Sequence, residues 1–224
     1  MTVLAPLHFA DAREAAALAA FLTRLVHYDR AAAVRLQAGG GALAVFGRPP
    51  SFEVLAIRTA RLVDAVDLDV TVSAGELLDG IEETASKAVV PGAVTGPPWA
   101  GVLPPRSGWR PVEGLPGAAE MRGAVAAAVA EFRTRDEALP EERRTRAERD
   151  RIGREIWSRT LGATGLPLRA VHAAQSLGFL PPAGAEEGGP VALFASGPWL
   201  RLRTPYGSVA LRTVPMGLPV TPGR

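Results

Sequence analysis

The chain contains 224 residues and no cysteine, and its formal net charge is +2 at pH 7. The lack of cysteine excludes disulfides, thiolate zinc sites, iron–sulfur clusters and cysteine nucleophiles. At about 100–200 residues per domain the length allows one large domain or two small ones, and an apolar content of 47% is enough to build a core.

Arginine dominates the basic residues, because Lys87 is the single lysine among 25 Lys and Arg. Together with 24 Gly and 20 Pro, this is typical of a GC-rich genome such as an actinobacterial one, so the arginine excess partly reflects codon usage. Residues 1–9 lack the charged and apolar parts of a signal peptide, and no apolar run approaches the ~18 residues that a membrane span needs. We therefore expect a cytoplasmic protein without membrane contact.

The first half of the chain alternates between helix and strand signals. A capping box at Asp11–Glu14 predicts a helix to about Tyr28, and a second one at Ser73–Glu76 predicts a helix through Ala85. Apolar or alternating runs bounded by glycine and proline predict strands at residues 32–37, 42–46, 52–60 and 68–72. Residues 52–60 are apolar on both faces, which indicates a central strand covered on both sides.

Residues 90–117 are rich in proline and glycine and show no hydrophobic period. Loops of this length are usually either functional or linkers. Trp99 and Trp109 are unusual in a flexible linker, so we expect the segment to pack on the body and connect two halves. A binding loop and a disordered linker are the alternatives.

The second half begins with three predicted helices, at residues 118–134, 141–160 and 168–177. The first and third have clear apolar stripes at helical spacing. The middle helix is of mixed charge, with acid-first pairs four residues apart such as Glu142–Arg146 and Asp150–Arg154. We expect a solvated helix that is stabilised by ion pairs.

Residues 190–214 are the most regular stretch, with strands predicted at 191–196, 199–203 and 208–214. Strict alternation and a Pro-Tyr-Gly turn indicate a hairpin in which Arg203 lies opposite Ser208. This register turns Leu200 and Leu202 toward the core. The alternative register, with Thr204 opposite Ser208, is less favourable because it would set Arg203 against Val209.

The other face of the hairpin is aromatic and basic. Because tryptophan and arginine are enriched in interface hot spots, this face and the two tryptophans of the connecting segment form a candidate interaction surface. Its members are Trp199, Arg201, Arg203, Arg212, Trp99 and Trp109. The alternative is a solvated sheet face with extended arginine side chains.

Together these elements predict an α+β fold of mainly antiparallel sheets packed against helices. Residues 42–59 and 199–213 share the order strand, proline turn and strand ending in Arg-Thr, which suggests two pseudo-symmetric αβ units. The predicted division is therefore residues 1–89, a connecting segment 90–117, residues 118–214 and a tail at 215–224. A single compact domain is the alternative.

The sequence lacks recognisable catalytic and metal-binding motifs. His8, His27 and His172 are too far apart for metal-ligand spacing, and the latter two fit structural roles. The glycines at 39–41 lack the features of a phosphate-binding loop, and the carboxylate pairs at 82–83 and 186–187 support no acid–base mechanism. We predict no catalytic, cofactor-binding or metal-binding residues, and no cofactor.

Three functions follow from these observations. The favoured one is a non-catalytic interaction protein, such as a regulatory or chaperone-like subunit, with a protein partner or a second copy of itself. The first alternative is a winged-helix-like nucleic-acid binder in the basic second half, with Arg201, Arg203 and Arg212 on backbone phosphates. The second is a small-molecule-binding protein or enzyme with a pocket beneath residues 90–117.

Overall fold

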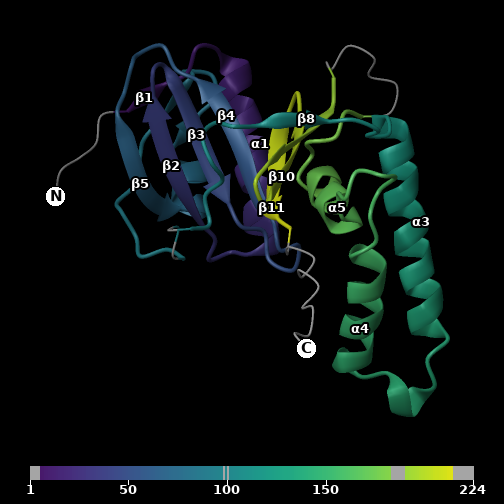
Figure 1. The fold of residues 1–224 in the computed structure, drawn as a ribbon. Helices are drawn as coiled ribbons and strands as arrows, with labels where there is room; N and C mark the ends of the chain where they lie inside the picture. Colours follow the sequence, from purple (N-terminus) through teal and green to yellow (C-terminus); the bar gives the residue numbers. More distant parts are fainter. Residues whose placement is uncertain (1–5, 98, 100, 183–189, 214–224) are drawn as a thin grey trace, which may run out of the picture.

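The computed structural model describes residues 6–97, 99, 101–182 and 190–213. Its main feature is one antiparallel eight-stranded sheet in the order β5-β2-β3-β4-β11-β10-β9-β8 (Figure 1). The predicted α+β fold with antiparallel sheets packed against helices is confirmed. The predicted tail at 215–224 and the carboxylates at 186–187 lie outside the described residues.

The first half of the chain contributes four neighbouring strands of this sheet, the connecting segment contributes one, and the second half contributes three. The first four are β2 (Ala33–Gly39), β3 (Ala42–Gly47), β4 (Leu55–Arg61) and β5 (Leu68–Ser73). The others are β8 (Arg110–Val112), β9 (Ala192–Ser196), β10 (Trp199–Thr204) and β11 (Gly207–Arg212). A small second sheet pairs β1 (Leu7–His8), β7 (Lys87–Ala88) and β6 (Ile81–Glu82).

The helices are α1 (Ala12–Tyr28), α2 (Ala74–Asp79), α3 (Ala118–Glu137), α4 (Arg146–Trp157) and α5 (Leu168–Ser176). A short 3₁₀ turn, η1 (Glu141–Arg143), precedes α4. Asp11 caps α1 as predicted, because its side chain accepts a hydrogen bond from the Glu14 N–H at 3.0 Å.

The two halves join where β4 pairs with β11. Ser208 lies opposite Ile57, and Val209 lies opposite Ala56. Two separate sheets would each leave an unpaired edge strand here, and the pairing removes both edges. The prediction that β4 is a central strand is confirmed, whereas the expected pair of small sheets is instead one continuous sheet. The domain boundaries at 89/90 and 117/118 stay a prediction.

Helices cover one face of this sheet, which we call the helix face (Figure 1). α1 packs against β4 and α5 packs against β11, so both halves share one hydrophobic core. The predicted hairpin register is confirmed: Arg203 lies opposite Ser208, and Leu200 lies opposite Leu211. Leu200 and Leu202 point into this core, as expected, with 8% and 0% of their surface exposed.

The opposite face of the sheet carries a second, smaller apolar cluster. Its buried members are Phe46, Leu55, Ile57, Trp99, Trp199 and Ala210, with Leu103 and Trp109 packed at its margin. A Cβ on Gly96 would lie 2.5 Å from Thr71 Cγ2, so the connecting segment runs close to this face. The expectation that this segment packs on the body is confirmed.

Two predicted helices are shorter in the structure. The helix expected through Ala85 ends at Asp79, because the chain turns at Gly80 into a β6–β7 pairing; a Cβ on Gly80 would lie 2.7 Å from the Val89 carbonyl oxygen. The helix expected from Glu141 begins at Arg146 instead, because Thr145 caps it and accepts a hydrogen bond from the Glu148 N–H at 3.3 Å.

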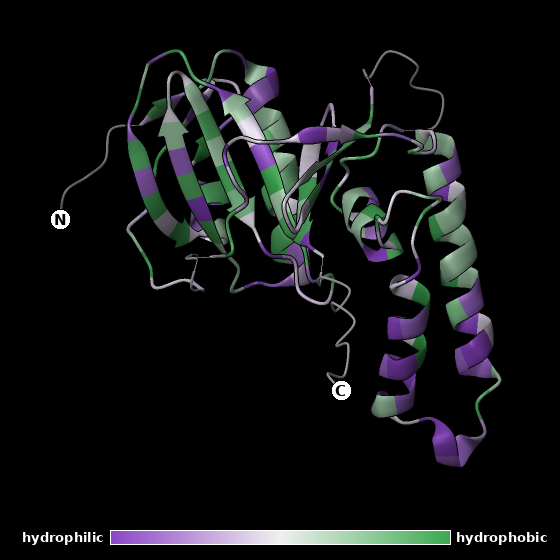
Figure 2. Ribbon diagram, in the orientation of Figure 1, coloured by the Kyte–Doolittle hydropathy of each residue, from purple (hydrophilic) through white to green (hydrophobic). Residues whose placement is uncertain are grey.

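Helices α3 and α4 form a hairpin that extends away from the sheet, and we call it the arm (Figure 1). Its buried side chains lie near the body, and its distal end is mostly hydrophilic (Figure 2). The buried residues are Met121, Val125 and Ala128 on α3 and Ile152 and Ile156 on α4. The expected solvated helix is therefore confirmed for α4.

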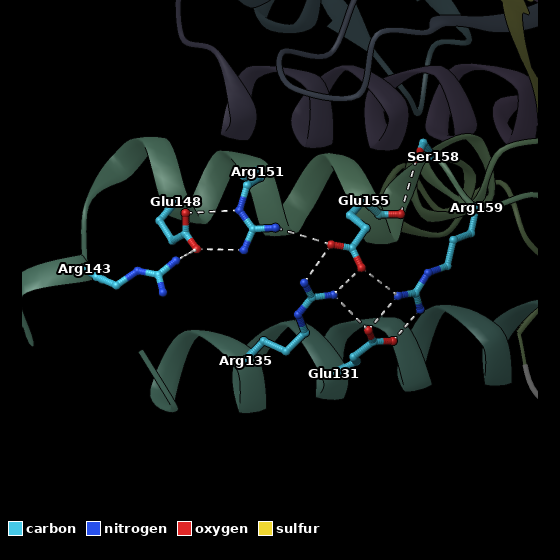
Figure 3. A network of polar contacts seen from close by, with 8 residues as sticks. All are labelled: Glu131, Arg135, Arg143, Glu148, Arg151, Glu155, Ser158 and Arg159. Carbon is cyan, nitrogen blue, oxygen red and sulfur yellow. Dashed lines mark hydrogen bonds and ion pairs between the residues drawn. The ribbon is translucent and has the colours of Figure 1, made fainter. Parts of the chain in front are cut away.

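Ion pairs connect the two helices of the arm (Figure 3). Arg135 donates to both carboxylate oxygens of Glu155 at 2.8 Å. Arg159 donates to both carboxylate oxygens of Glu131, at 2.5 and 2.7 Å. The hydrogen bonds from Arg135 lower the pKa of Glu155 to about 2. The partners differ from those predicted: Arg146 lies 3.8 Å from Asp150, not next to Glu142.

Candidate binding groove on the second face of the sheet

Arg201 and Arg203 alternate along β10 and therefore share the face opposite the helices. Together with Trp109 they line a hollow of about 700 Å³, which we call the arginine groove. The other described lining residues come from β4, the segment that leads into β9, β9 itself, the end of β10, the turn after it and β11: Thr59, Pro190, Ala192, Phe194, Thr204, Pro205, Gly207 and Ser208.

Two neighbours fix the half-buried guanidinium of Arg201. Its central carbon lies 5.9 Å from the Trp109 ring centroid, and its Nη2 donates to Ser208 Oγ at 3.2 Å. The Trp109 ring is itself anchored, because its Nε1 donates to the Pro105 carbonyl at 2.9 Å. The connecting segment thus fixes the position of the arginine through Trp109.

The charged residues among the described lining of the groove, Arg201 and Arg203, are both positive. Burial lowers the pKa of Arg201, and the positive charge of Arg203 lowers it further. Among the described residues, no carboxylate oxygen lies within 4.0 Å of either guanidinium, and the buried Arg201 Nε has no hydrogen-bond partner. Desolvation and like-charge repulsion both oppose this arrangement within the free protein.

Such an arrangement suits an anionic ligand. A carboxylate or phosphate would accept hydrogen bonds from the two guanidinium groups and remove the repulsion between them. The groove volume of about 700 Å³ falls in the range of ligand sites, and none of the described lining residues is acidic.

The structure divides the six predicted surface residues among different environments. Arg201, Arg203 and Trp109 line the groove. Trp199 and Trp99 are buried in the second cluster, with 9% and 8% of their surface exposed, because the connecting segment covers this part of the sheet.

Arg212 is exposed and lies over the Trp199 ring, 5.8 Å from its centroid, away from the groove. Sequence reasoning missed Thr59 and Phe194. Phe194 could have been found from the sequence, because strands were predicted at 191–196 and 199–203, one directly after the other. In the structure these two strands pair, and Phe194 lies opposite Arg201. Thr59 could not have been found in this way, because it reaches the groove only through the pairing of β4 with β11.

The histidine environments favour structure over chemistry. His172 stacks on Trp157 with ring centroids 4.4 Å apart and meets Phe52 edge-on at 5.2 Å. Burial lowers the pKa of His172. Within the described residues, no three side chains of the metal-binding types come together. None of the described helices is long and apolar enough to cross a membrane.

The topology also bears on the winged-helix hypothesis. A wing is a hairpin that is free to contact DNA, but β10 and β11 are flanked by β9 and β4 within the sheet. The order of three helices and a hairpin is present, yet the hairpin is an internal part of the sheet. Among the described residues the predicted wing is therefore not a free hairpin, and the nucleic-acid hypothesis itself stays a prediction.

Two family models match the chain. The first is described as a domain of unknown function (DUF8010) and covers residues 3–101. The second is described as a domain of unknown function (DUF8185) and covers residues 104–216, half of the chain. No curated protein matched the sequence. The boundary between the two matches falls inside the predicted connecting segment at 90–117.

Proposed function

We propose that this chain, which belongs to the family of the domain of unknown function DUF8185, is a non-catalytic interaction protein. In this proposal its arginine groove binds an acidic segment of a protein partner. The observation that supports this most is the half-buried Arg201 beside Arg203, without a carboxylate among the described residues to neutralise them. The proposed compartment is the cytoplasm, as the sequence predicts.

The spacing of the two arginines favours an extended peptide as the ligand. Alternate residues of a strand lie about 6.6 Å apart, and the same distance separates alternate side chains of an extended partner. Acidic residues at every second position of such a segment would each meet one guanidinium. Phe194 and Trp109 add aromatic contact area, which is typical of the centre of interfaces.

A direct test is fluorescence anisotropy with a fluorescein-labelled oligo-glutamate peptide. We expect the wild type to bind it, with an affinity that falls as salt is added. Arg203→Gln should weaken binding about tenfold, because a hydrogen-bonded charge pair is lost. Arg203 is exposed, so this variant should still fold.

Arg146→Gln is the matched control, because it removes the same charge from the arm, where the Arg146 side chain is 96% exposed. Equal losses in the two variants would show that only net charge matters and would overturn the proposal. The alternative of a nucleic-acid partner would be favoured if oligo-thymidine bound more tightly than the peptide and depended on Arg203.

A further inference from the structure

A second hollow lies where the three parts of the chain meet, and we call it the junction pocket. Its volume is about 820 Å³, and it shares no lining residue with the arginine groove. The first half contributes Arg48 and Val54, the connecting segment contributes Gly96, and the second half contributes Trp199 and Arg212. A ligand here would contact both family-matched regions at once.

The lining of the junction pocket contains apolar side chains and several charged ones. The charged side chains differ in whether another residue of the protein pairs with them. Arg169 Nε lies 3.5 Å from Glu53 Oε2, and Asp29 accepts a hydrogen bond from the Ala31 N–H at 2.9 Å. Of the two carboxylates in the described lining, Glu53 is thus paired with an arginine and Asp29 is held by a backbone N–H. By contrast, Arg48 and Arg212 have no carboxylate within 4.0 Å in the part of the chain that the structure describes.

The backbone beside these residues is strained. Ser51 and Glu53 both line the pocket and have positive φ angles, of 69° and 53°, which non-glycine residues rarely adopt. Left-handed residues of this kind cluster at ligand sites and switch regions, where the surrounding structure holds them. The strained turn also supplies the carboxylate that engages Arg169, so it shapes the charge pattern of the pocket.

We propose that the junction pocket binds a small organic anion with an aromatic or apolar body. The anionic group would lie between Arg48 and Arg212, and the body would pack on Trp199, Val54 and the connecting segment. The pocket volume of about 820 Å³ lies within the range that is typical of small-molecule sites. The site is independent of the proposed partner groove, because Arg201 and Arg203 do not line it.

Because one arginine comes from each half of the chain, the ligand would also fasten the two halves together. Binding to the folded state alone raises the melting temperature, and the rise grows with the logarithm of ligand concentration once that concentration exceeds Kd. The expected signature is therefore a ligand-dependent rise in melting temperature that becomes smaller when either Arg48 or Arg212 is replaced.

The test uses the full chain and the fluorescent sulfonate 1-anilinonaphthalene-8-sulfonate, with the uncharged N-phenyl-1-naphthylamine as the matched probe. We expect saturable binding of the sulfonate at one site and weaker binding of the uncharged probe. Arg48→Gln and Arg212→Gln should each weaken sulfonate binding at least about threefold, because each removes a charge-assisted hydrogen bond. Arg48→Lys should recover part of the loss.

Arg203→Gln is the control that separates this site from the arginine groove, and it should leave sulfonate binding unchanged. Equal affinity for the two probes would contradict the need for an anion. Loss of binding in Arg203→Gln, with none in Arg48→Gln or Arg212→Gln, would assign the probe to the groove and overturn the proposal. Both arginines are exposed, so melting temperatures without probe should match the wild type.

Discussion

Arginines are used differently in the arm and in the arginine groove. On the arm, Arg135 and Arg159 each donate to both oxygens of a glutamate, within a network that joins α3 to α4 (Figure 3). In the groove, Arg201 and Arg203 have no such partner among the described residues. The same type of side chain therefore stabilises the fold in one region, and in our proposal it binds a ligand in the other.

Toward its distal end the arm has ion pairs and partly buried apolar side chains such as Phe132 and Leu139. The buried residues of α3 stop at Ala128, and those of α4 begin at Ile152. Exposed ion pairs individually stabilise by only about 0–1 kcal/mol, so the network holds the arm weakly compared with the apolar core under the sheet. We expect the arm to open locally more often than the sheet.

The first prediction concerns a variant in which the groove arginines gain a carboxylate partner within the protein, as the arginines of the arm already have. Thr59→Glu places a carboxylate in the groove, where it can pair with the arginines. We expect at least about tenfold weaker binding of the oligo-glutamate peptide, because the protein now supplies its own anion. Thr59→Gln is the matched control and should bind as the wild type does. Unchanged binding by Thr59→Glu would place the peptide elsewhere.

The second prediction removes one partner from the arm. Glu155→Gln leaves Arg135 without its bidentate acceptor. Hydrogen exchange should accelerate a few-fold for amides of α4 and stay unchanged for the sheet, because the arm opens locally. Glu142→Gln, an equal charge change at the exposed η1 turn, should have little effect. A uniform acceleration across the molecule would show that arm and sheet open as one unit.

The third prediction concerns pH. Bonding to arginine lowers the pKa of Glu131, Glu148 and Glu155, the last to about 2. A lowered folded-state pKa contributes stability that is present above the ordinary value near 4.5 and is lost as pH falls toward 2. Helical circular dichroism should decline over this window, and Glu155→Gln should reduce the decline. An identical decline in that variant would exclude a contribution from Glu155.

The parts of the fold that depend on local sequence patterns could be predicted from the sequence, whereas the pairing of distant segments could not. The β10–β11 register followed from the alternation of Leu200 and Leu202, and the start of α1 followed from Asp11. The pairing of Ile57 with Ser208 did not, because an apolar strand gives no indication of which distant strand will be its neighbour.

The groove was predicted in part for the same reason. Alternation placed Arg201 and Arg203 on one face, and that part needed only the local pattern. The burial of Trp199 and Trp99 depended on residues 90–117, which have no period from which a packing position could be derived. The cation–π contact between Arg201 and Trp109 joins the two regions, so it appears only in three dimensions.

The unfolding free energy of Arg203→Gln tests the account most directly, because it requires no knowledge of the ligand. If Arg203 serves to bind a partner and not to stabilise the fold, its removal relieves the charge repulsion on Arg201. The free energy of unfolding measured in urea should then be unchanged within about 0.5 kcal/mol or should rise. A loss of more than about 1 kcal/mol would show that Arg203 stabilises the fold, and would contradict the assignment of the arginine groove as a binding site.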